Sequence, residues 1–239
     1  DWPAGVDWDD PHQDAACMVQ LRDGSWRLAF GNTGMHCLDM NGNELWYKPL
    51  REAQHVVPGR FRTDSELQFM VINRGNCDTL EPATLILYDL DGRELWRREQ
   101  PSGSWAGKCE AINWFGPGRP DCAFISGRSH AVCIPRGGEK IFYGTPQPLP
   151  RDPNGLCSIP EGATEVLYML DPIIPEAIYD GDGNIVHTLT MQYARDVTDE
   201  ERTHLFYSHT ADVWGDGRDE VLIFGTRGAC IQANAHPLA

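Results

Sequence analysis

Arginine and histidine recur at matching places along this sequence. Three short turns carry an arginine, and three segments that lead into an apolar stretch carry a histidine; these residues are Arg74, Arg128, Arg227, His12, His55 and His209. Arginine offers a planar fork of donors to a carboxylate. Histidine exchanges a proton near neutral pH. Together, the two residue types predict a site for an acidic sugar, a uronate.

The arginines would bind and activate the sugar. Neutralising a uronate carboxylate makes the C5 proton more acidic, and we expect Arg74 and Arg128 to do so, because neighbouring repeats would bring them together. The other residues expected to bind the sugar are Arg227, Gln54 and Asn73. A single arginine in a turn is as often a solvated charge or half of an ion pair. Recurrence at matching positions, in a chain with 20 basic residues against 35 acidic ones, favours a shared anionic ligand.

The histidines would move the protons. The base that removes the C5 proton would be His55 or His12, and the oxygen that leaves when the bond at O4 breaks by β-elimination would take a proton from His209 or Tyr207. For any one of these histidines, a structural hydrogen bond is the more common role. The sequence leaves the choice between His12 and His55 open.

A repeated stretch would position these residues. The segment 39–46, Asp-Met-Asn-Gly-Asn-Glu-Leu-Trp, returns at 89–96 as Asp-Leu-Asp-Gly-Arg-Glu-Leu-Trp. Aspartate or asparagine followed by glycine, between two apolar runs, predicts a tight hairpin. Weaker copies follow the apolar runs 131–134 and 176–179. The turn glycines of the four copies, Gly42, Gly92, Gly138 and Gly183, are 50, 46 and 45 residues apart.

Each repeat contains four short apolar stretches, which we call strands A to D. Four strands in about 45 residues predict one blade of an all-β propeller made of four-stranded antiparallel sheets. About four and a half blades can be traced, so residues 1–239 are expected to form a single propeller domain that does not complete a ring. The proline-rich segment 145–162 predicts an irregular loop, and the charged segment 196–202 predicts one helical turn.

The order of strands in a blade decides where the arginines and histidines meet. The A–B and C–D turns lie at one end of an antiparallel blade, while the B–C turn and the connection into the next strand A lie at the other. The arginines fall in B–C turns and the histidines precede strand A, so both should converge at one end of the central channel. Trp46 and Trp96 are expected to pack neighbouring blades together instead of binding a ligand.

The composition argues against several classes of partner. The formal net charge is -15 and the sequence pI is about 4.8, so nucleic acid and anionic membranes are poor partners. No apolar run approaches the roughly 18 residues that a membrane helix needs. No N-terminal secretion signal is present, so we expect a mature or trimmed chain. A monomer that binds an acidic polysaccharide is the expected state.

The eight cysteines include no CxxC pair. An even number without metal-binding spacing favours disulfides formed in an oxidising compartment, and the alternative is buried free thiols. An anionic sugar held by arginine requires no cofactor. Calcium is a secondary prediction, because oxygen-bearing side chains alternate at Asp180, Asp182 and Asn184, and a second acidic loop spans 212–219.

Three segments resemble a known family. The runs 52–61, 73–75 and 212–221 are similar to blades of secreted propeller polysaccharide lyases, namely the rhamnogalacturonan lyases and, more closely, the fungal L-rhamnose-α-1,4-D-glucuronate lyases that act on gum arabic. The resemblance implies a seven-bladed propeller, a secreted enzyme and β-elimination at a glucuronate with release of rhamnose.

Two other classes of protein compete with a lyase. A non-catalytic, lectin-like propeller would use the same arginines to bind acidic sugar without cleaving it. A quinone-dependent dehydrogenase propeller also carries the repeated tryptophan stretch, but no vicinal cysteine pair supports that interpretation. A base positioned beside the arginines would distinguish a lyase from a lectin.

Overall fold

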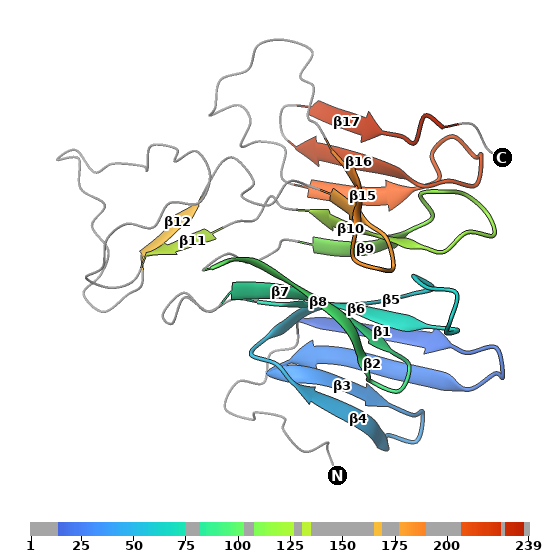
Figure 1. The fold of residues 1–239 in the computed structure, drawn as a ribbon, viewed down its shortest axis with the longest axis vertical. Coiled ribbons are helices and arrows are strands. Elements are labelled where there is room, and N and C mark those ends of the chain that lie inside the picture. The colour runs from blue at the N-terminus through green and yellow to red at the C-terminus, as the bar shows by residue number, and fades with distance from the viewer. Residues whose placement is uncertain are drawn as a thin grey trace.

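The computed structural model of the protein describes residues 14–74, 82–102, 108–126, 131–134, 165–168, 177–189, 207–225 and 228–236. Most strands in these ranges form four antiparallel sheets of three or four strands (Figure 1). No helix occurs among the described residues, and so none there is long and apolar enough to cross a membrane. The predicted all-β class is confirmed.

Sheets 1 and 2 each contain four strands in sequence order. Sheet 1 consists of β1 (Ala15–Gln20), β2 (Trp26–Asn32), β3 (Gly34–Leu38) and β4 (Glu44–Pro49). Sheet 2 consists of β5 (Ala53–Gly59), β6 (Gln68–Asn73), β7 (Pro82–Asp89) and β8 (Glu94–Ser102). The two sheets match the first two predicted repeats.

Sheets 3 and 4 follow the same order, with one interruption. Sheet 3 consists of β9 (Lys108–Ile112), β10 (Cys122–Ser126), β13 (Ala177–Tyr179) and β14 (Ile185–Thr188). Between β10 and β13, strands β11 (Ala131–Ile134) and β12 (Glu165–Tyr168) pair only with each other. Sheet 4 consists of β15 (Tyr207–Ala211), β16 (Glu220–Gly225) and β17 (Gly228–Gln232).

This arrangement corrects the predicted third repeat. We expected 131–134 to be strand C of a blade whose turn contains Gly138, but β11 lies outside sheet 3, and the turn at Gly183 closes sheet 3 instead. The described residues therefore form three four-stranded sheets, one three-stranded sheet and the separate β11–β12 pair, not four and a half blades. Gly138 and the segments 145–162 and 196–202 lie outside the described residues.

The three hairpins at the end of strand C share one local structure. In the first, the Asp39 carboxylate accepts hydrogen bonds from the backbone N–H groups of Asn41 (2.8 Å) and Asn43 (2.9 Å), and Gly42 takes a φ of 82°. The turns that begin at Asp89 and Asp180 repeat these contacts. Because the aspartate satisfies the turn's donors and the glycine tolerates a positive φ, the four-residue motif closes a hairpin wherever it occurs.

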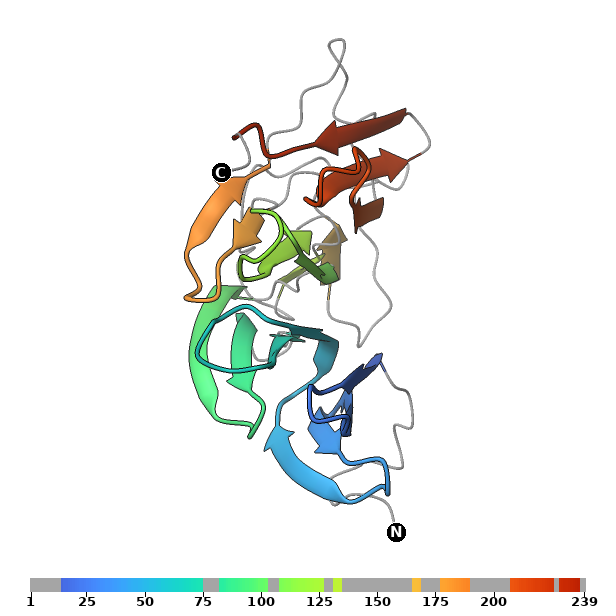
Figure 2. The same ribbon diagram turned by 90° about the vertical axis from the view of Figure 1, so that its right-hand side faces the viewer.

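The four sheets are fanned out along an arc (Figure 2). The first strands of successive sheets lie side by side, since β1 contacts β5, β5 contacts β9, and β9 contacts β15. The fourth strands β4, β8 and β14 lie along the outer, left-hand edge of the arc in Figure 2. The described sheets thus pack face to face in sequence order.

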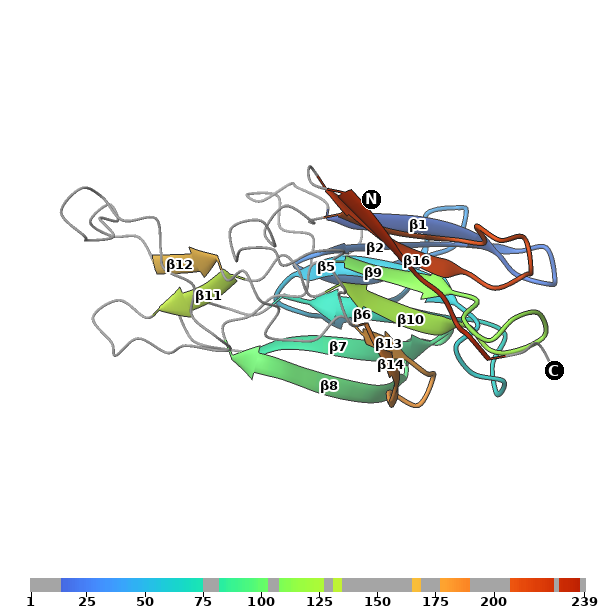
Figure 3. The same cartoon turned by 90° about the horizontal axis from the view of Figure 1, so that it is seen from above.

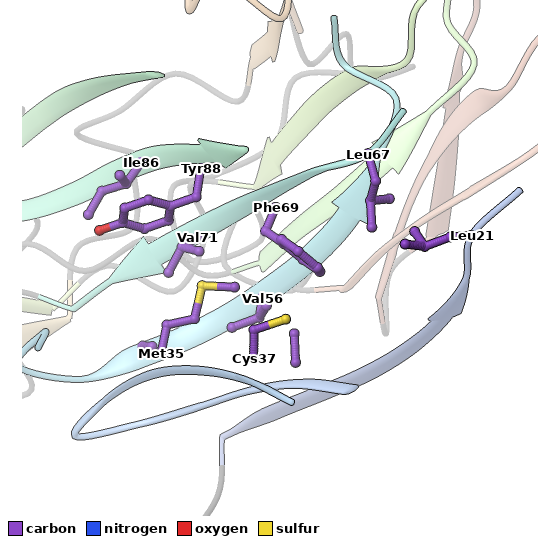
Figure 4. Packing of buried hydrophobic residues seen from close by; sticks show 11 residues of the cluster. Leu21, Met35, Cys37, Val56, Leu67, Phe69, Val71, Ile86 and Tyr88 are labelled. Carbon is purple, nitrogen blue, oxygen red and sulfur yellow. The ribbon is translucent and has the colours of Figure 1, made fainter. Parts of the chain in front are cut away.

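Apolar side chains fill the space between neighbouring sheets. Between sheets 1 and 2, Met35 and Cys37 pack against Val56, Phe69 and Val71, as Figure 4 shows. Two further clusters lie between sheets 2 and 3 and between sheets 3 and 4. Alternate residues of each middle strand point to opposite faces. The middle strands therefore read as continuous apolar runs, because both of their faces are buried.

The repeated tryptophans join one sheet to the turn of the next. The Trp46 indole donates to the Leu90 carbonyl of sheet 2 (2.8 Å), and the Trp96 indole donates to the Gly181 carbonyl of sheet 3 (2.8 Å). The Trp46 ring also packs edge-on against Phe69, with centroids 5.9 Å apart. The expectation that both tryptophans pack neighbouring sheets together is confirmed.

Aspartates just before strand B make a second junction between sheets. Asp121 of sheet 3 accepts a hydrogen bond from the backbone N–H of Arg60 in sheet 2 (2.7 Å) and donates its own N–H to the Arg60 carbonyl (2.9 Å). Asp219 of sheet 4 makes the same pair of bonds with Asn113 of sheet 3, at 2.6 Å and 3.0 Å. These paired bonds fix the ends of the first strands relative to one another.

Five of the cysteines are free thiols: Cys17, Cys37, Cys109, Cys122 and Cys230. The predicted disulfides are therefore wrong for these five residues, while Cys77 and Cys157, and the side chain of Cys133, lie outside the described part of the structure. Burial raises the pKa of the Cys17 thiol to about 11 and that of Cys37 and Cys122 to about 12. These thiols serve as small apolar side chains of the core.

Candidate functional site

The predicted site lies at the end of the sheets where the first strands begin. Strands β5, β9 and β15 bring His55, Glu110 and His209 to neighbouring positions around the inner edge of the arc. The small sheet of β11 and β12 lies beyond the same end (Figures 1 and 3). His209 lies within β15, whereas we expected it to precede strand A, and Glu110 likewise lies within β9.

Arg74 lies at this end as predicted, but it pairs with a carboxylate of the protein. Its Nη1 donates to Glu52 Oε1 (2.7 Å), and its backbone N–H donates to the Glu52 carbonyl (2.8 Å). Asn73 is buried, accepts from the Glu52 N–H (3.1 Å) and donates to Thr84 Oγ1 (3.3 Å). Asn73 therefore links Glu52 and Thr84 within the turn, and its role in sugar binding stays a prediction.

Gln54 connects two sheets. A β-bulge between Ala53 and His55 sets Gln54 out of register with β6, and its Nε2 donates to Asp14 Oδ1 in sheet 1 (3.1 Å). Bulges of this kind redirect a side chain and are frequent beside functional sites. His55 follows directly and is half-buried. The bulge therefore fixes the positions of both residues relative to sheet 1.

The clearest acid–base pair at this end is His209 with Glu110. His209 Nδ1 lies 3.6 Å from Glu110 Oε1, and the His209 side chain is 65% exposed while that of Glu110 is 15% exposed. At this distance the two groups form an electrostatic contact that is longer than a hydrogen bond. The Glu110 carboxylate of sheet 3 thus lies beside a solvent-exposed imidazole of sheet 4.

Four of the predicted residues cannot be placed in this way. His12, Arg128 and Arg227 lie outside the described residues, and of Tyr207 only the backbone, in β15, is described. The expected proximity of Arg74 and Arg128 therefore stays a prediction. Gln54, His55, Arg74 and His209 do share one end of the sheets.

The sequence interpretation missed the carboxylates at this end. It predicted a ring of arginine and histidine, whereas the structure places Glu52 against Arg74, Asp14 against Gln54 and Glu110 against His209. Each acid stands in the short segment that enters strand A, or just inside that strand. This shared position was a signal that the sequence already contained.

The two loops considered for calcium are closed by their own hydrogen bonds. Asp180 accepts from the backbone N–H groups of Asp182 (2.9 Å) and Asn184 (2.8 Å). Asp212 accepts from the N–H groups of Asp216 and Gly217, both at 3.0 Å. Among the residues whose placement is described, no group of three or more His, Cys, Asp or Glu side chains is arranged to hold a metal ion.

Comparisons with known proteins are sparse. The sequence matches no family model, and no curated protein is significantly similar to it. One similar solved structure is that of a protein of unknown function from Bacteroides caccae, with 10% sequence identity and a TM-score of 0.38. The similarity covers 89% of this chain and 52% of that one, so the chain spans about half the length of that protein.

Proposed function

We propose that the protein is a polysaccharide lyase that cleaves a uronate linkage in an acidic polysaccharide by β-elimination. The observation that carries the proposal is the exposed His209 imidazole, which lies beside the Glu110 carboxylate of the neighbouring sheet. A positioned base or acid is what separates a catalytic sugar site from a simple binding site. The resemblance to secreted propeller lyases supports the same class.

In the proposed reaction, a histidine takes the C5 proton of the uronate. The electron pair of that C–H bond becomes the C4–C5 double bond, the bond from C4 to O4 breaks, and O4 leaves with a proton. We assign one of these proton transfers to the exposed His209 imidazole on β15 and the other to His55 on β5, with β9 between these two strands. Arg74 and Arg128 remain the proposed partners of the substrate carboxylate, and Arg227 a proposed sugar contact.

One observation favours the non-catalytic alternative. Arg74 already holds Glu52 at 2.7 Å, so a substrate carboxylate would have to share the guanidinium with Glu52 or displace it. If Arg74 is only structural, the elimination mechanism loses one of the two arginines proposed to neutralise the carboxylate, whereas a binding protein could still hold the sugar through Arg128 and Arg227. We therefore keep an acidic-sugar-binding protein as the second candidate.

We further propose that the four sheets are blades of a β-propeller. Each of the first three sheets packs face to face on the next, and the tryptophan contact recurs at two successive junctions. Val221 and Ile223 of sheet 4 pack against sheet 3, so strand alternation turns Phe224 to the opposite face, where it is exposed together with Ile231. An exposed apolar face is expected of a blade that packs on a further blade. A seven-bladed ring remains the expected whole.

The test is the ultraviolet absorbance of the unsaturated uronate that elimination creates, followed during incubation with gum arabic and with rhamnogalacturonan. General acid–base catalysis contributes about a hundredfold to ten-thousandfold. His209→Gln should therefore slow the rise by about a hundredfold or more. Glu110→Gln should cause a smaller loss and shift the pH profile of kcat, because Glu110 acts only through its electrostatic contact with His209.

The matched control is His236→Gln, which replaces an exposed histidine near the first turns of sheets 3 and 4, at the opposite end. Its activity should equal that of the unaltered protein. A rise in absorbance that His209→Gln leaves unchanged would contradict the assigned site. Binding of either polymer without any rise would establish the lectin-like alternative.

A further inference from the structure

A groove lies at the end of the sheets opposite the predicted catalytic site. Two adjoining cavities, of about 680 Å³ and 340 Å³, open between the first turns of sheets 1, 2 and 3, and both are lined by Arg62, Asp64 and Arg119. The larger cavity also reaches Arg22 and Arg60. Four arginines therefore line the two cavities, together with five carboxylates: Asp64, Glu66, Asp121, Asp180 and Asp182.

The carboxylates of the groove are already engaged within the protein. Asp121 accepts the Arg60 backbone N–H (2.7 Å), and Glu66 accepts the Arg22 backbone N–H. Asp64 and Asp182 bind the Arg62 side chain, with Asp64 Oδ2 2.8 Å from Nη2, and Asp180 accepts backbone N–H groups of its own turn. The Arg62 guanidinium holds the pKa of the Asp64 carboxyl below its ordinary value, so this acid stays ionised and paired with Arg62.

The guanidinium groups of Arg60 and Arg119 differ from that of Arg62, because no carboxylate of the described residues pairs with them. Within the described residues, Arg60 forms its hydrogen bonds through the backbone, and no carboxylate pairs with its side chain. Arg119 lies over the Phe115 ring, with Cζ 5.8 Å from the ring centroid, and likewise has no carboxylate partner in this part of the structure. Both side chains are exposed and line the larger cavity. Acids outnumber bases 35 to 20 in this chain. Arginines without a carboxylate partner therefore indicate a site for an anionic ligand.

The groove also offers an apolar surface beside these charges. Phe115 is 38% exposed and lines the smaller cavity together with Val186. A volume of a few hundred Å³ is typical of small-molecule sites. A uronate residue combines a carboxylate, which suits an arginine fork, with a sugar ring whose C–H face can cover an aromatic ring.

We propose that this groove is a second binding site for a carboxylated sugar, with Arg60 and Arg119 holding the carboxylate and Phe115 supporting the ring. The site performs no chemistry. It would anchor an acidic polysaccharide at the turn end of the sheets while another stretch of the polymer occupies the other end. The proposal does not require the elimination reaction, since an acidic-sugar-binding protein without activity would carry the same groove.

The experiment uses trigalacturonate as the probe and its methyl ester as the uncharged control. Arginine side-chain NMR signals of the whole chain are followed during titration, with Arg60 and Arg119 assigned from the Arg60→Gln and Arg119→Gln variants. A charge-assisted hydrogen bond contributes about 1.5–3 kcal/mol, so each variant should weaken binding at the groove by about tenfold or more. The control variant is Arg93→Gln, which removes an exposed arginine paired with Asp89 on the turn of sheet 2.

The two ends of the sheets are then distinguished by variants. The Arg60 and Arg119 signals should shift with trigalacturonate, should not shift with the ester, and should still shift when Arg74 and His209 are replaced by glutamine. Loss of these shifts in the Arg74→Gln, His209→Gln double variant would show that the groove is not a separate site. Equal shifts with the ester, or none with either probe, would overturn the proposal. If these shifts remain but no elimination activity is found, only the proposed lyase function is refuted, and the second binding site stands.

Discussion

Replacing Gly92 by alanine tests how far a tryptophan contact stabilises the junction between sheets 1 and 2. Gly92 has a φ of 78°, and a Cβ added there would lie 2.7 Å from Trp46 Cδ2 and 3.1 Å from Lys48 Cε. The Trp46 ring cannot easily retreat, because its Nε1 is bonded to the Leu90 carbonyl and the ring packs on Phe69. The matched substitution is Gly42→Ala, at a φ of 82°, where an added Cβ would meet nothing within 4 Å.

The expected magnitudes follow from these two environments. A positive φ costs an alanine about 1–2 kcal/mol, and this cost is common to both variants. The gain from a less flexible unfolded chain is also common to both and cancels in the comparison. Only Gly92→Ala adds the cost of overpacking, about 1–3 kcal/mol. For a chain of this size, that difference corresponds to a Tm lower by about 2–12 °C.

The assay is thermal and urea unfolding of both variants and the unaltered protein, followed by circular dichroism and tryptophan fluorescence. Gly92→Ala should be less stable than Gly42→Ala in both thermal and urea unfolding. Equal losses of stability in the two variants would refute this prediction, because the contact with Trp46 is the only difference expected between them. The sequence motif alone predicts that equal result, since the two glycines hold the same place in their repeats.

Two further predictions concern protonation. Hydrogen bonds from the Asn43 side chain and backbone lower the pKa of Asp39 below its ordinary value of 3.8; this acid therefore stabilises the fold above about pH 4 and loses that contribution as the pH falls through its folded pKa. The drop in urea midpoint between about pH 5 and pH 2 should be smaller in Asp39→Asn, and an unchanged drop would contradict this. Burial raises the pKa of Cys37 and Cys122 to about 12, so iodoacetamide at about pH 8 should label both only after unfolding, as mass spectrometry of their peptides would show. Labelling of the folded protein as rapid as that of the unfolded chain would oppose the burial argument.

Much of the fold could be predicted because its signals are local. The hairpins at Asp39, Asp89 and Asp180 close through hydrogen bonds that span only two to four residues, so the four-residue motif carries its own structure. The third repeat failed for the opposite reason. The long connection between β10 and β13 contains Gly138 at about the expected interval, and periodicity alone does not distinguish an insertion from a blade. The copy at Arg136 lacked the leading aspartate that the other three turns use.

The positions of several candidate residues on the sheets were predictable, but their partners were not. Strand order alone placed His55, Arg74 and His209 at one end of the sheets, and the described strands agree. The sequence did not show that Arg74 pairs with Glu52, 22 residues away, or that Glu110 of sheet 3 lies beside His209 of sheet 4. Asn73 was assigned to a ligand although the turn itself uses both ends of its amide.

The sequence by itself determined the all-β class, the hairpin turns and the tryptophans that join neighbouring sheets. Each of these depends on the conformational preferences of a few adjacent residues, or on a regular alternation of apolar side chains. Only the tertiary structure decided which strands complete sheet 3, which carboxylates accompany the basic residues, and where Arg60 and Arg119 meet in a groove. Those features arise from contacts between segments far apart in the chain, and the geometry of such contacts is set by how the sheets pack, not by any local preference.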